Sequence, residues 1–352
     1  MAKERVNIYT IAREAGVSAA TVSRVMTNNA KVSSEKRERV EAVIRKYGYA
    51  PNALAQGLST AKTHTIGLMI ADISSPFYTT LATACEKAAN QSGYMLMILS
   101  SLGDYELEKR QLIKMYEQQV DAIVVIGGRI DHVSADEEYV ELLNRLASTT
   151  PVIATGRLPG ADTKQVCLDE ERCMDLVMEH LIGLGHQRIA MIGGRRKAKS
   201  TFEKRMRYRA MLRENGIGVR EEYILETEDY GNESGYARMK QLIRSGGELP
   251  TAVVAINDYT ASGIIRALHE AGIRVPEDIA VTAFDDTYLS SAVTPPLTSA
   301  GCDYAEFGRV LINTAIRASN EEEVPEKQVI PVHLTIREST ASGKNGSYGS
   351  SA

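Results

Sequence analysis

The chain has 352 residues, enough for two or three domains, and its 43 % hydrophobic and 24 % charged residues exclude bulk disorder. No run of 18 apolar residues occurs, and no apolar segment follows the charged start, which argues against a membrane span and a signal peptide. The cysteines have no metal-ligand spacing, so the sequence predicts a cytoplasmic protein with reduced, buried thiols at Cys85, Cys167, Cys173 and Cys302.

The formal net charge of −4 is distributed unevenly along the chain. Residues 1–62 carry 11 Lys and Arg against 5 Asp and Glu, a balance of +6, which leaves 30 against 40, or −10, for the remainder. A basic head on an acidic body indicates that contacts with nucleic-acid phosphates, if they exist, are local to the head. The alternative is a solvated basic face without a partner.

The head reads as helices only. Apolar residues share one helical face in Ile8–Ala15, Gly16 interrupts the pattern, and Ser18 is a good N-cap for a second helix. Residues 9–24 therefore have the dimensions of a DNA-binding helix-turn-helix, whose second helix (Ser18–Met26) would lie in the major groove. The exposed positions of that helix suit close approach to DNA: Ala19, Ala20, Thr21, Ser23 and Arg24. Plain helix packing is the competing interpretation.

A third helix follows, because Ser33 can cap it and apolar residues recur at helical spacing over 40–47. Gly48 ends it. Residues 52–60 can also form a helix, but Gly57 in its interior costs roughly 1 kcal/mol and so short a segment does not hold a helix alone. We expect this segment to fold only when a partner supports it.

From Thr65 onward, short apolar runs alternate with amphipathic stretches, which is typical of βαβ units. The runs are 65–71, 95–101, 122–128 and 151–156, then 188–194, 252–258 and 278–286. They predict two doubly wound lobes, each a parallel sheet with helices on both faces. The Gly/Ser-rich end at 341–352 is expected to be a flexible tail.

The head is similar in detail to one known family. Residues 11–60, which begin IAREAGVSAATVSRVM and end NALAQGLST, resemble the headpiece and hinge of the lactose-repressor (LacI/GalR) family. The resemblance implies that Ala19, Ala20 and Arg24 face bases. It implies phosphate contacts, or support for them, from Tyr9, Ser18, Thr21, Ser23, Asn28 and Lys31.

In the same resemblance Leu58, with Asn52 and Ala55 nearby, occupies the position of a minor-groove wedge. A leucine inserted at a central base step unstacks and kinks the duplex, which costs a few kcal/mol and is offset by additional contacts. The competing interpretation is one more core leucine.

The resemblance continues to about Thr340, through IGLMIADISSPFYTTL, HLIGLGHQRIAMIGG and TPPLTS among others. It implies an α/β core related to periplasmic sugar-binding proteins, with a ligand between two lobes joined by three crossovers. We therefore expect a helix-turn-helix headpiece at 1–50, a hinge at 51–62 and a two-lobed, doubly wound periplasmic-binding-protein-like core at 63–340. The N-lobe is expected at 63–163 and 303–322, and the C-lobe at 164–302 and 323–340.

Ligands of such cores lie at the carboxyl ends of the strands. Polar residues stand there in Asp72, Asn257 and Asp285, and Phe77 and Tyr78 offer apolar walls, a set that suits a polyhydroxylated effector. The competing interpretation is that Asp and Asn at these junctions are helix caps.

Several positions depart from the family pattern. Lys204 stands in place of a ligand-binding arginine, for which Arg205 could substitute by a shift of one residue, and Arg207 replaces a glycine. Gly156 and Cys302 stand where the lactose repressor has an acidic residue and a glutamine, so lactose-like ligands are not implied. The Gly/Ser tail replaces the leucine heptads through which that repressor tetramerises, so a dimer is favoured.

Taken together, the residues and the resemblance predict a homodimeric repressor that binds a palindromic operator in double-stranded DNA under the control of a sugar-like effector. Two alternatives stay open: a catabolite-control regulator with a phosphorylated phosphocarrier protein as corepressor, and a small-molecule binding protein that does not bind DNA. No nucleotide-binding, nucleophile-elbow or zinc motif occurs, so neither catalysis nor a cofactor, a metal or a membrane partner is predicted.

Overall fold

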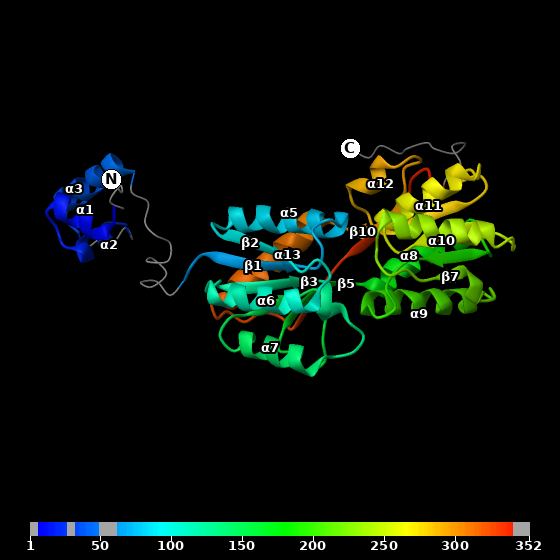
Figure 1. Ribbon diagram of the computed structural model, residues 1–352, viewed down its shortest axis with the longest axis horizontal. Coiled ribbons are helices and arrows are strands. Elements are labelled where there is room, and N and C mark those ends of the chain that lie inside the picture. Colours follow the sequence, from blue (N-terminus) through cyan, green and yellow to red (C-terminus); the bar gives the residue numbers. More distant parts are fainter. Residues whose placement is uncertain (1–5, 27–31, 49–61, 341–352) are drawn as a thin grey trace. The chain divides into compact units, whose positions relative to one another are not determined.

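The computed structural model in Figure 1 describes residues 6–26, 32–48 and 62–340. The chain divides into two compact units, Met1–Thr63 and His64–Ala352. The expected tail at 341–352 and most of the expected hinge lie outside the described residues.

The first unit contains the helices α1 (Ile8–Ala15), α2 (Ala19–Met26) and α3 (Ser34–Tyr47). The side chain of Asn7 caps α1, and Gly16 ends it in the left-handed conformation at φ 65°, which makes the turn into α2 tight. The backbone N–H of Thr21 donates to Ser18 Oγ at 3.2 Å, which confirms Ser18 as a cap. Ser33 precedes α3 as expected, but its side chain makes no capping hydrogen bond.

A small core joins the three helices. Ile11, Val22 and Val40 have no exposed surface, and they come from α1, α2 and α3 respectively. One face of α2 is therefore committed to packing, and the opposite face is left for other contacts.

The second unit is built on two six-stranded sheets. The first has the order β11-β5-β4-β3-β1-β2 and is entirely parallel. Its strands are β1 (Thr65–Ile70), β2 (Met95–Ser100), β3 (Ala122–Ile126), β4 (Val152–Ala154), β5 (Lys164–Leu168) and β11 (Lys327–Ile330). The central strands β1, β3 and β4 are buried along their whole length, as their continuous apolar runs predict.

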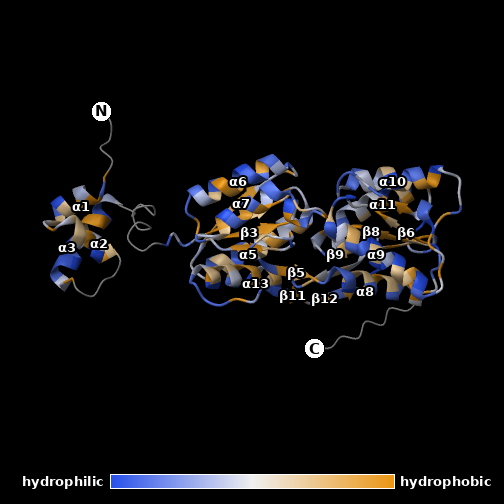
Figure 2. Ribbon diagram, turned by 90° about the horizontal axis from the view of Figure 1, so that it is seen from below, coloured by the Kyte–Doolittle hydropathy of each residue, from blue (hydrophilic) through white to orange (hydrophobic). Residues whose placement is uncertain are grey.

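Helices cover both faces of this first sheet. The helices α5 (Pro76–Gln91) and α13 (Tyr304–Ser319) share one buried cluster with it. The helices α6 (Tyr105–Glu117) and α7 (Glu137–Ala147), with the 3-10 turn η1 (Gly128–Asp131), lie on the other face. Figure 2 shows hydrophobic residues concentrated on strands such as β3, with hydrophilic residues on the outer surfaces of the helices.

The second sheet has the order β12-β10-β9-β8-β6-β7. Its strands are β6 (Ile189–Ile192), β7 (Ile224–Leu225), β8 (Ala252–Ala255), β9 (Ala280–Asp285), β10 (Thr298–Cys302) and β12 (Val332–Thr335). The helices α8 (Glu170–Gly183) and α9 (Lys199–Glu214) pack on one face, and α10 (Asn232–Arg244) and α11 (Asp258–Glu270) on the other. The short η2 (Glu221–Tyr223) and α12 (Tyr288–Ala292) complete the lobe.

The chain passes between the two sheets three times, after β5, after β10 and after β11. The expected lobe boundaries were wrong for two strands, since β5 and β11 pair with each other in the first sheet. Both strands are short and partly polar, so their sequences carry no signal for which sheet they join. The second sheet is also not purely parallel, because β12 runs antiparallel to β10.

Close helix packing in the second lobe generates a stability prediction. A Cβ on Gly263 of α11 would lie 1.9 Å from the backbone oxygen of Asn232 in α10. Gly263→Ala should therefore push the helices apart and lower the free energy of unfolding by about 1–3 kcal/mol in urea denaturation. Gly183→Ala is the control, because nothing lies within 4 Å of a Cβ there. Equal effects of both substitutions would contradict this packing.

Candidate functional site

The outer face of α2 carries the residues expected to meet DNA. Ser18, Ala20 and Arg24 are exposed, whereas Ala19, Thr21 and Ser23 are half-buried. The hydroxyls of Ser18 and Thr21 lie 2.9 Å apart, so they hold each other at the start of the helix. This face combines small side chains, hydroxyls and a guanidinium, which is the chemistry of groove and phosphate contacts.

Tyr9 adds an aromatic ring to the surface of the first unit. It is 73 % exposed on α1, one residue after the start of the helix, although a tyrosine usually buries most of its ring. The remaining head residues expected at DNA lie outside the described residues: Asn28, Lys31, Asn52, Ala55 and Leu58.

The second unit contains a cavity of about 830 Å³ between its two sheets. Residues that follow the strand ends line it from both lobes, including Asp72 after β1, Thr155 after β4, Asn257 after β8 and Asp285 at the end of β9. This is the place at which open α/β sheets bind ligands. Six of the seven residues expected at the effector meet there: Asp72, Phe77, Tyr78, Lys204, Asn257 and Asp285.

Asp285 lies in an unusual stretch of backbone. Its φ is 93° and that of Asp286 is 50°, so two consecutive residues with side chains occupy the left-handed region. Among the described residues none donates a hydrogen bond to the Asp285 carboxylate, which faces the cavity. Burial raises the pKa of this carboxyl well above its usual range, with a further contribution from Asp258.

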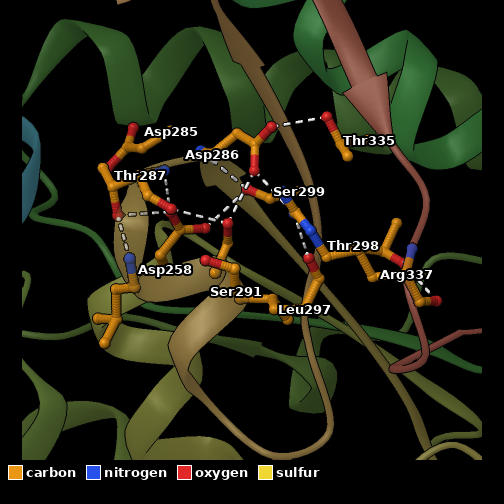
Figure 3. Close-up of polar contacts among 12 residues, drawn as sticks. Asp258, Asp285, Asp286, Thr287, Ser291, Leu297, Thr298, Ser299, Thr335 and Arg337 are labelled. Carbon is orange, nitrogen blue, oxygen red and sulfur yellow. Dashed lines mark hydrogen bonds and ion pairs between the residues drawn. The ribbon is translucent and has the colours of Figure 1, made fainter.

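A network of polar contacts holds the backbone at Asp285 (Figure 3). The Asp286 carboxylate accepts hydrogen bonds from Ser290 Oγ at 2.8 Å and Thr335 Oγ1 at 2.6 Å, and it pairs with Arg337 at 2.7 Å. Its backbone N–H donates to Ser299 Oγ at 3.0 Å. Asp286 therefore has a structural role, because it holds this stretch of backbone in place. The Asp285 side chain takes no part in these contacts and is available to the cavity.

Asp258 completes this network from the first turn of α11. Its carboxylate accepts from Ser299 Oγ at 2.7 Å and from the N–H and hydroxyl of Thr287 at 2.7 and 2.9 Å. Burial raises the pKa of Asp258 to about 6, although the hydrogen bonds oppose the shift. The sequence did not single out this residue, because an aspartate at a helix start is usually a solvated cap.

Asn257 caps α11, as the competing interpretation holds, whereas Asp72 caps no helix, because Ser75 stands at the N-cap position of α5. Both Asp72 and Asn257 line the cavity. Asp72 Oδ1 accepts from the N–H and hydroxyl of Ser74 at 2.9 and 2.7 Å. Asn257 Oδ1 accepts from Thr260 N at 2.8 Å at the start of α11. Each of these local contacts uses one side-chain atom, so Asp72 Oδ2 and the Asn257 amide nitrogen remain for a ligand.

The aromatic wall comes from the first turn of α5. The rings of Phe77 and Tyr78 lie edge to face at 5.2 Å, and burial raises the pKa of Tyr78 well above its usual range. A Cβ on Gly127 would lie 2.2 Å from the Tyr78 hydroxyl, and one on Gly128 the same distance from Glu108. Close packing, together with the positive φ of both residues, therefore accounts for the double glycine after β3.

The two basic residues expected at the effector have different positions on α9. Lys204 lines the cavity, pairs with Glu170 and lies with its Nζ 5.0 Å from the centre of the Phe284 ring. Arg205, in contrast, does not line the cavity, so the expectation that it contacts the effector was wrong.

Successive residues of a helix point about 100° apart, so the side chain of Arg205 points away from the cavity and lies behind its wall. There it donates to the carbonyls of Gly193 and Gly194, both at 2.9 Å. Arg207 points to Asp175 and Glu214 instead.

Residues without any motif also bridge the cavity. The Asp131 carboxylate at the end of η1 accepts from the N–H and hydroxyl of Ser200 on α9 at 2.9 and 2.6 Å. Val133 N donates to the Lys197 carbonyl at 3.0 Å across the same gap. Burial raises the pKa of Asp131 to about 6. No sequence signal relates two residues 69 positions apart.

No group of three or more His, Cys, Asp or Glu with the geometry of a metal site occurs within 6–26, 32–48 and 62–340. In the same described ranges no helix combines the length and apolarity needed to cross a membrane.

A helix-turn-helix unit and a two-lobed core with a polar cavity define the class of DNA-binding regulators with a ligand-binding-protein core. The family model for bacterial regulatory proteins of the lacI family matches residues 7–52, and that for a periplasmic binding protein-like domain matches residues 178–340. The chain is 35 % identical over 338 residues to catabolite control protein A of Priestia megaterium, which covers 95 % of this chain and 99 % of that protein. The chain belongs to the lacI family.

Another relative and two solved structures also match this chain over most of its length. Catabolite control protein A of Staphylococcus xylosus is 34 % identical, covering 93 % of this chain and 97 % of that protein. The lac repressor dimer bound to operator and the anti-inducer ONPF superposes with a TM-score of 0.85 at 27 % identity, over 96 % of this chain and 99 % of that chain. The regulator CcpA of Lactococcus lactis gives 0.70 at 26 % identity, over 79 % and 99 %.

The buried carboxyl of Glu108, which supports η1, generates a prediction of how stability depends on pH. Glu108 is buried, accepts hydrogen bonds from Arg129 N and the Tyr139 hydroxyl, and its pKa rises through burial from 4.5 to about 7. The folded state then binds more protons than the unfolded state, so stability is lost as the pH rises from 4.5 through 7. Relative to Glu108→Gln, the unfolding free energy of the wild type should fall by about 3 kcal/mol over that range.

Urea titrations at several pH values measure this difference. Glu117→Gln changes the same residue type at an exposed position at the end of the same helix, and it should leave the pH profile of the wild type unchanged. Parallel profiles for the wild type and Glu108→Gln would contradict the buried titration.

Proposed function

We propose that the chain is a cytoplasmic, homodimeric transcription repressor without enzymatic activity, which binds a palindromic operator and responds to a small-molecule effector in the cavity. The observation that carries the proposal is the pairing of an exposed recognition face on α2 with a separate cavity in which polar groups converge. Two-fold symmetry of a dimer requires two matching half-sites, and thus a palindrome.

The proposed division of labour assigns each site a chemistry. Arg24 reads bases with its guanidinium, Ala19 and Ala20 allow close approach, and the neighbouring hydroxyls and Tyr9 contact phosphates. Leu58 acts as the minor-groove wedge at the end of a hinge that folds on DNA. In the cavity Asp285 is the principal effector contact.

The proposed coupling runs through the lobes. A ligand that contacts residues of both sheets stabilises one relative orientation of the lobes, and a dimer in that orientation holds the two hinges at a distance that favours or prevents their pairing on DNA. Such coupling is typically worth about 1–3 kcal/mol. An effector that prevents hinge pairing would release the protein from DNA, and an effector that favours pairing would recruit the protein to DNA. The scheme allows both.

A second candidate is a catabolite-control regulator whose corepressor is a phosphorylated phosphocarrier protein. Similarity to catabolite control protein A across 95 % of the chain favours it. In this case a protein partner, and not a metabolite alone, would strengthen operator binding. Titrating that partner into the operator complex separates the two candidates.

The first test concerns DNA. Selection from a random duplex pool should yield a palindrome, and Arg24→Ala should weaken binding to it by about 1–3 kcal/mol, roughly 5- to 150-fold, by fluorescence anisotropy. Arg45→Ala removes the same charge from an exposed position on α3 and should have a much smaller effect. Leu58→Ala should weaken operator binding and leave the dimer intact. The absence of any preferred duplex near physiological salt would refute the proposal.

The second test concerns the effector. A metabolite screen by thermal shift should give a ligand that raises the melting temperature of the wild type but not that of Asp285→Asn, because the amide has one acceptor oxygen where the carboxyl group has two. Asp162→Asn, exposed and away from the cavity lining, is the matched control. A ligand that stabilises both variants equally would place the effector elsewhere.

A further inference from the structure

Lys204 is a buried cation of the cavity wall. Only 7 % of this residue is exposed, and it projects from α9 between Glu170 and the face of Phe284. Burial is the largest single influence on the pKa of Lys204 and lowers it, but the charge and hydrogen bond of Glu170, together with Cys173 and Asp285, outweigh burial and raise the pKa above its ordinary value. The ammonium is therefore charged and already partnered.

Glu170 owes its position to the fold. It is the first residue of α8, immediately after the crossover that follows β5, and its side chain is 25 % exposed where it meets Lys204. Both residues line the cavity. The carboxylate thus lies beside the ammonium and inside the space that a ligand would enter.

Other carboxyls share this part of the cavity. Asp285 and Asp131 both line it, and the charge of Glu170 contributes to raising the pKa of each. One buried ammonium consequently faces three carboxyls: Glu170, Asp285 and Asp131. Even with Asp285 protonated, as its raised pKa favours, the Glu170 carboxylate balances the charge of the Lys204 ammonium, so little positive potential is left to attract a negatively charged ligand.

The remaining cations that line the cavity do not reverse this balance. Lys199 pairs with Glu203 at 3.7 Å, and Arg195 Nε donates to the Glu228 carbonyl at 2.9 Å while its guanidinium lies over Tyr230. Arg157 and Lys327 are exposed to water, which screens their charges.

An anion that binds to the Lys204 ammonium would have to displace the Glu170 carboxylate from it. The displaced carboxylate would stay in a partly buried place without its counter-charge, and the ligand would lose its own hydration. A ligand without negative charge can donate hydrogen bonds to Asp285 and leave the ion pair intact. The arrangement thus discriminates by penalising one class of ligand, as specific sites commonly do.

We propose that Glu170 is the specificity-determining residue that excludes phosphorylated and carboxylated ligands from the cavity, because it holds the Lys204 ammonium. This inference rests on the proposed role of the cavity as the effector site. It assigns the effector to ligands that carry no negative charge.

The test uses the full chain with glucose 6-phosphate and inorganic phosphate as probes. Glu170→Gln removes the competing charge and should bind glucose 6-phosphate at least roughly tenfold more tightly than the wild type in isothermal titration calorimetry, a difference of about 1.4 kcal/mol. The unpaired Lys204 should also lower the melting temperature of this variant, and phosphate should raise it more than it raises that of the wild type.

Two further variants keep the result interpretable. Glu171→Gln removes the same charge from the exposed neighbouring residue, which also lines the cavity, whereas the ion pair of Lys204 is with Glu170. This variant should therefore give a much smaller gain in anion binding than Glu170→Gln. Glu170→Asp keeps the charge, shortens the side chain and should give a smaller gain than Glu170→Gln, which provides a second reading if the glutamine variant fails to fold.

The outcomes separate the two proposals. Tight binding of glucose 6-phosphate by the wild type, or an equal gain in Glu171→Gln, overturns the role of Glu170. A gain confined to the Glu170 variants supports it, whether or not these ligands alter operator binding. The operator response is measured separately by anisotropy, and its absence would count against the proposed effector control alone.

Discussion

Parallel strand pairing is the constraint on which the rest of the structure depends. All strands of a parallel sheet end at the same edge, so the residues that follow them gather in one place. Because the chain crosses between the sheets three times, the gathered residues of both lobes line one cavity. Asp72 and Asp285, 213 positions apart in sequence (285 − 72), become neighbours in function through topology alone.

Buried carboxyl groups in and beside this cavity give it its chemical character. Burial raises the pKa of the carboxyls at Asp131, Asp258 and Asp285, and each is held by hydrogen bonds or left facing the cavity. Neutral donors such as Ser200 and Ser299 satisfy the first two without adding charge. The interior is therefore polar, and neutral donors supply much of the hydrogen bonding to its buried carboxyls.

The sequence was informative where one physical signal dominates. Continuous apolar runs identified β1, β3 and β4, and a glycine after a short amphipathic stretch identified the turn between α1 and α2. Short edge strands such as β5 and β11 have no such signal, since their place depends on partners far along the chain.

At the candidate site, the strand-end residues could be named in advance because topology fixes that edge. The sequence could not decide whether Lys204 or Arg205 lines the cavity, because a shift of one residue along a helix moves a side chain from the cavity to the protein interior behind its wall. Glu170 and Asp131 were not foreseen, because only the folded chain brings them to Lys204 and Ser200.

The three crossings between the lobes leave and enter strands that are neighbours in their sheets. In the first lobe β5 pairs with β11, and in the second β10 pairs with β12, so the connecting segments start and end on neighbouring strands. Because each of these two ladders lies within one lobe, a rotation of one lobe against the other can leave both ladders intact. The change in backbone angles would then be confined to the three connecting segments, which is the geometry of a hinge.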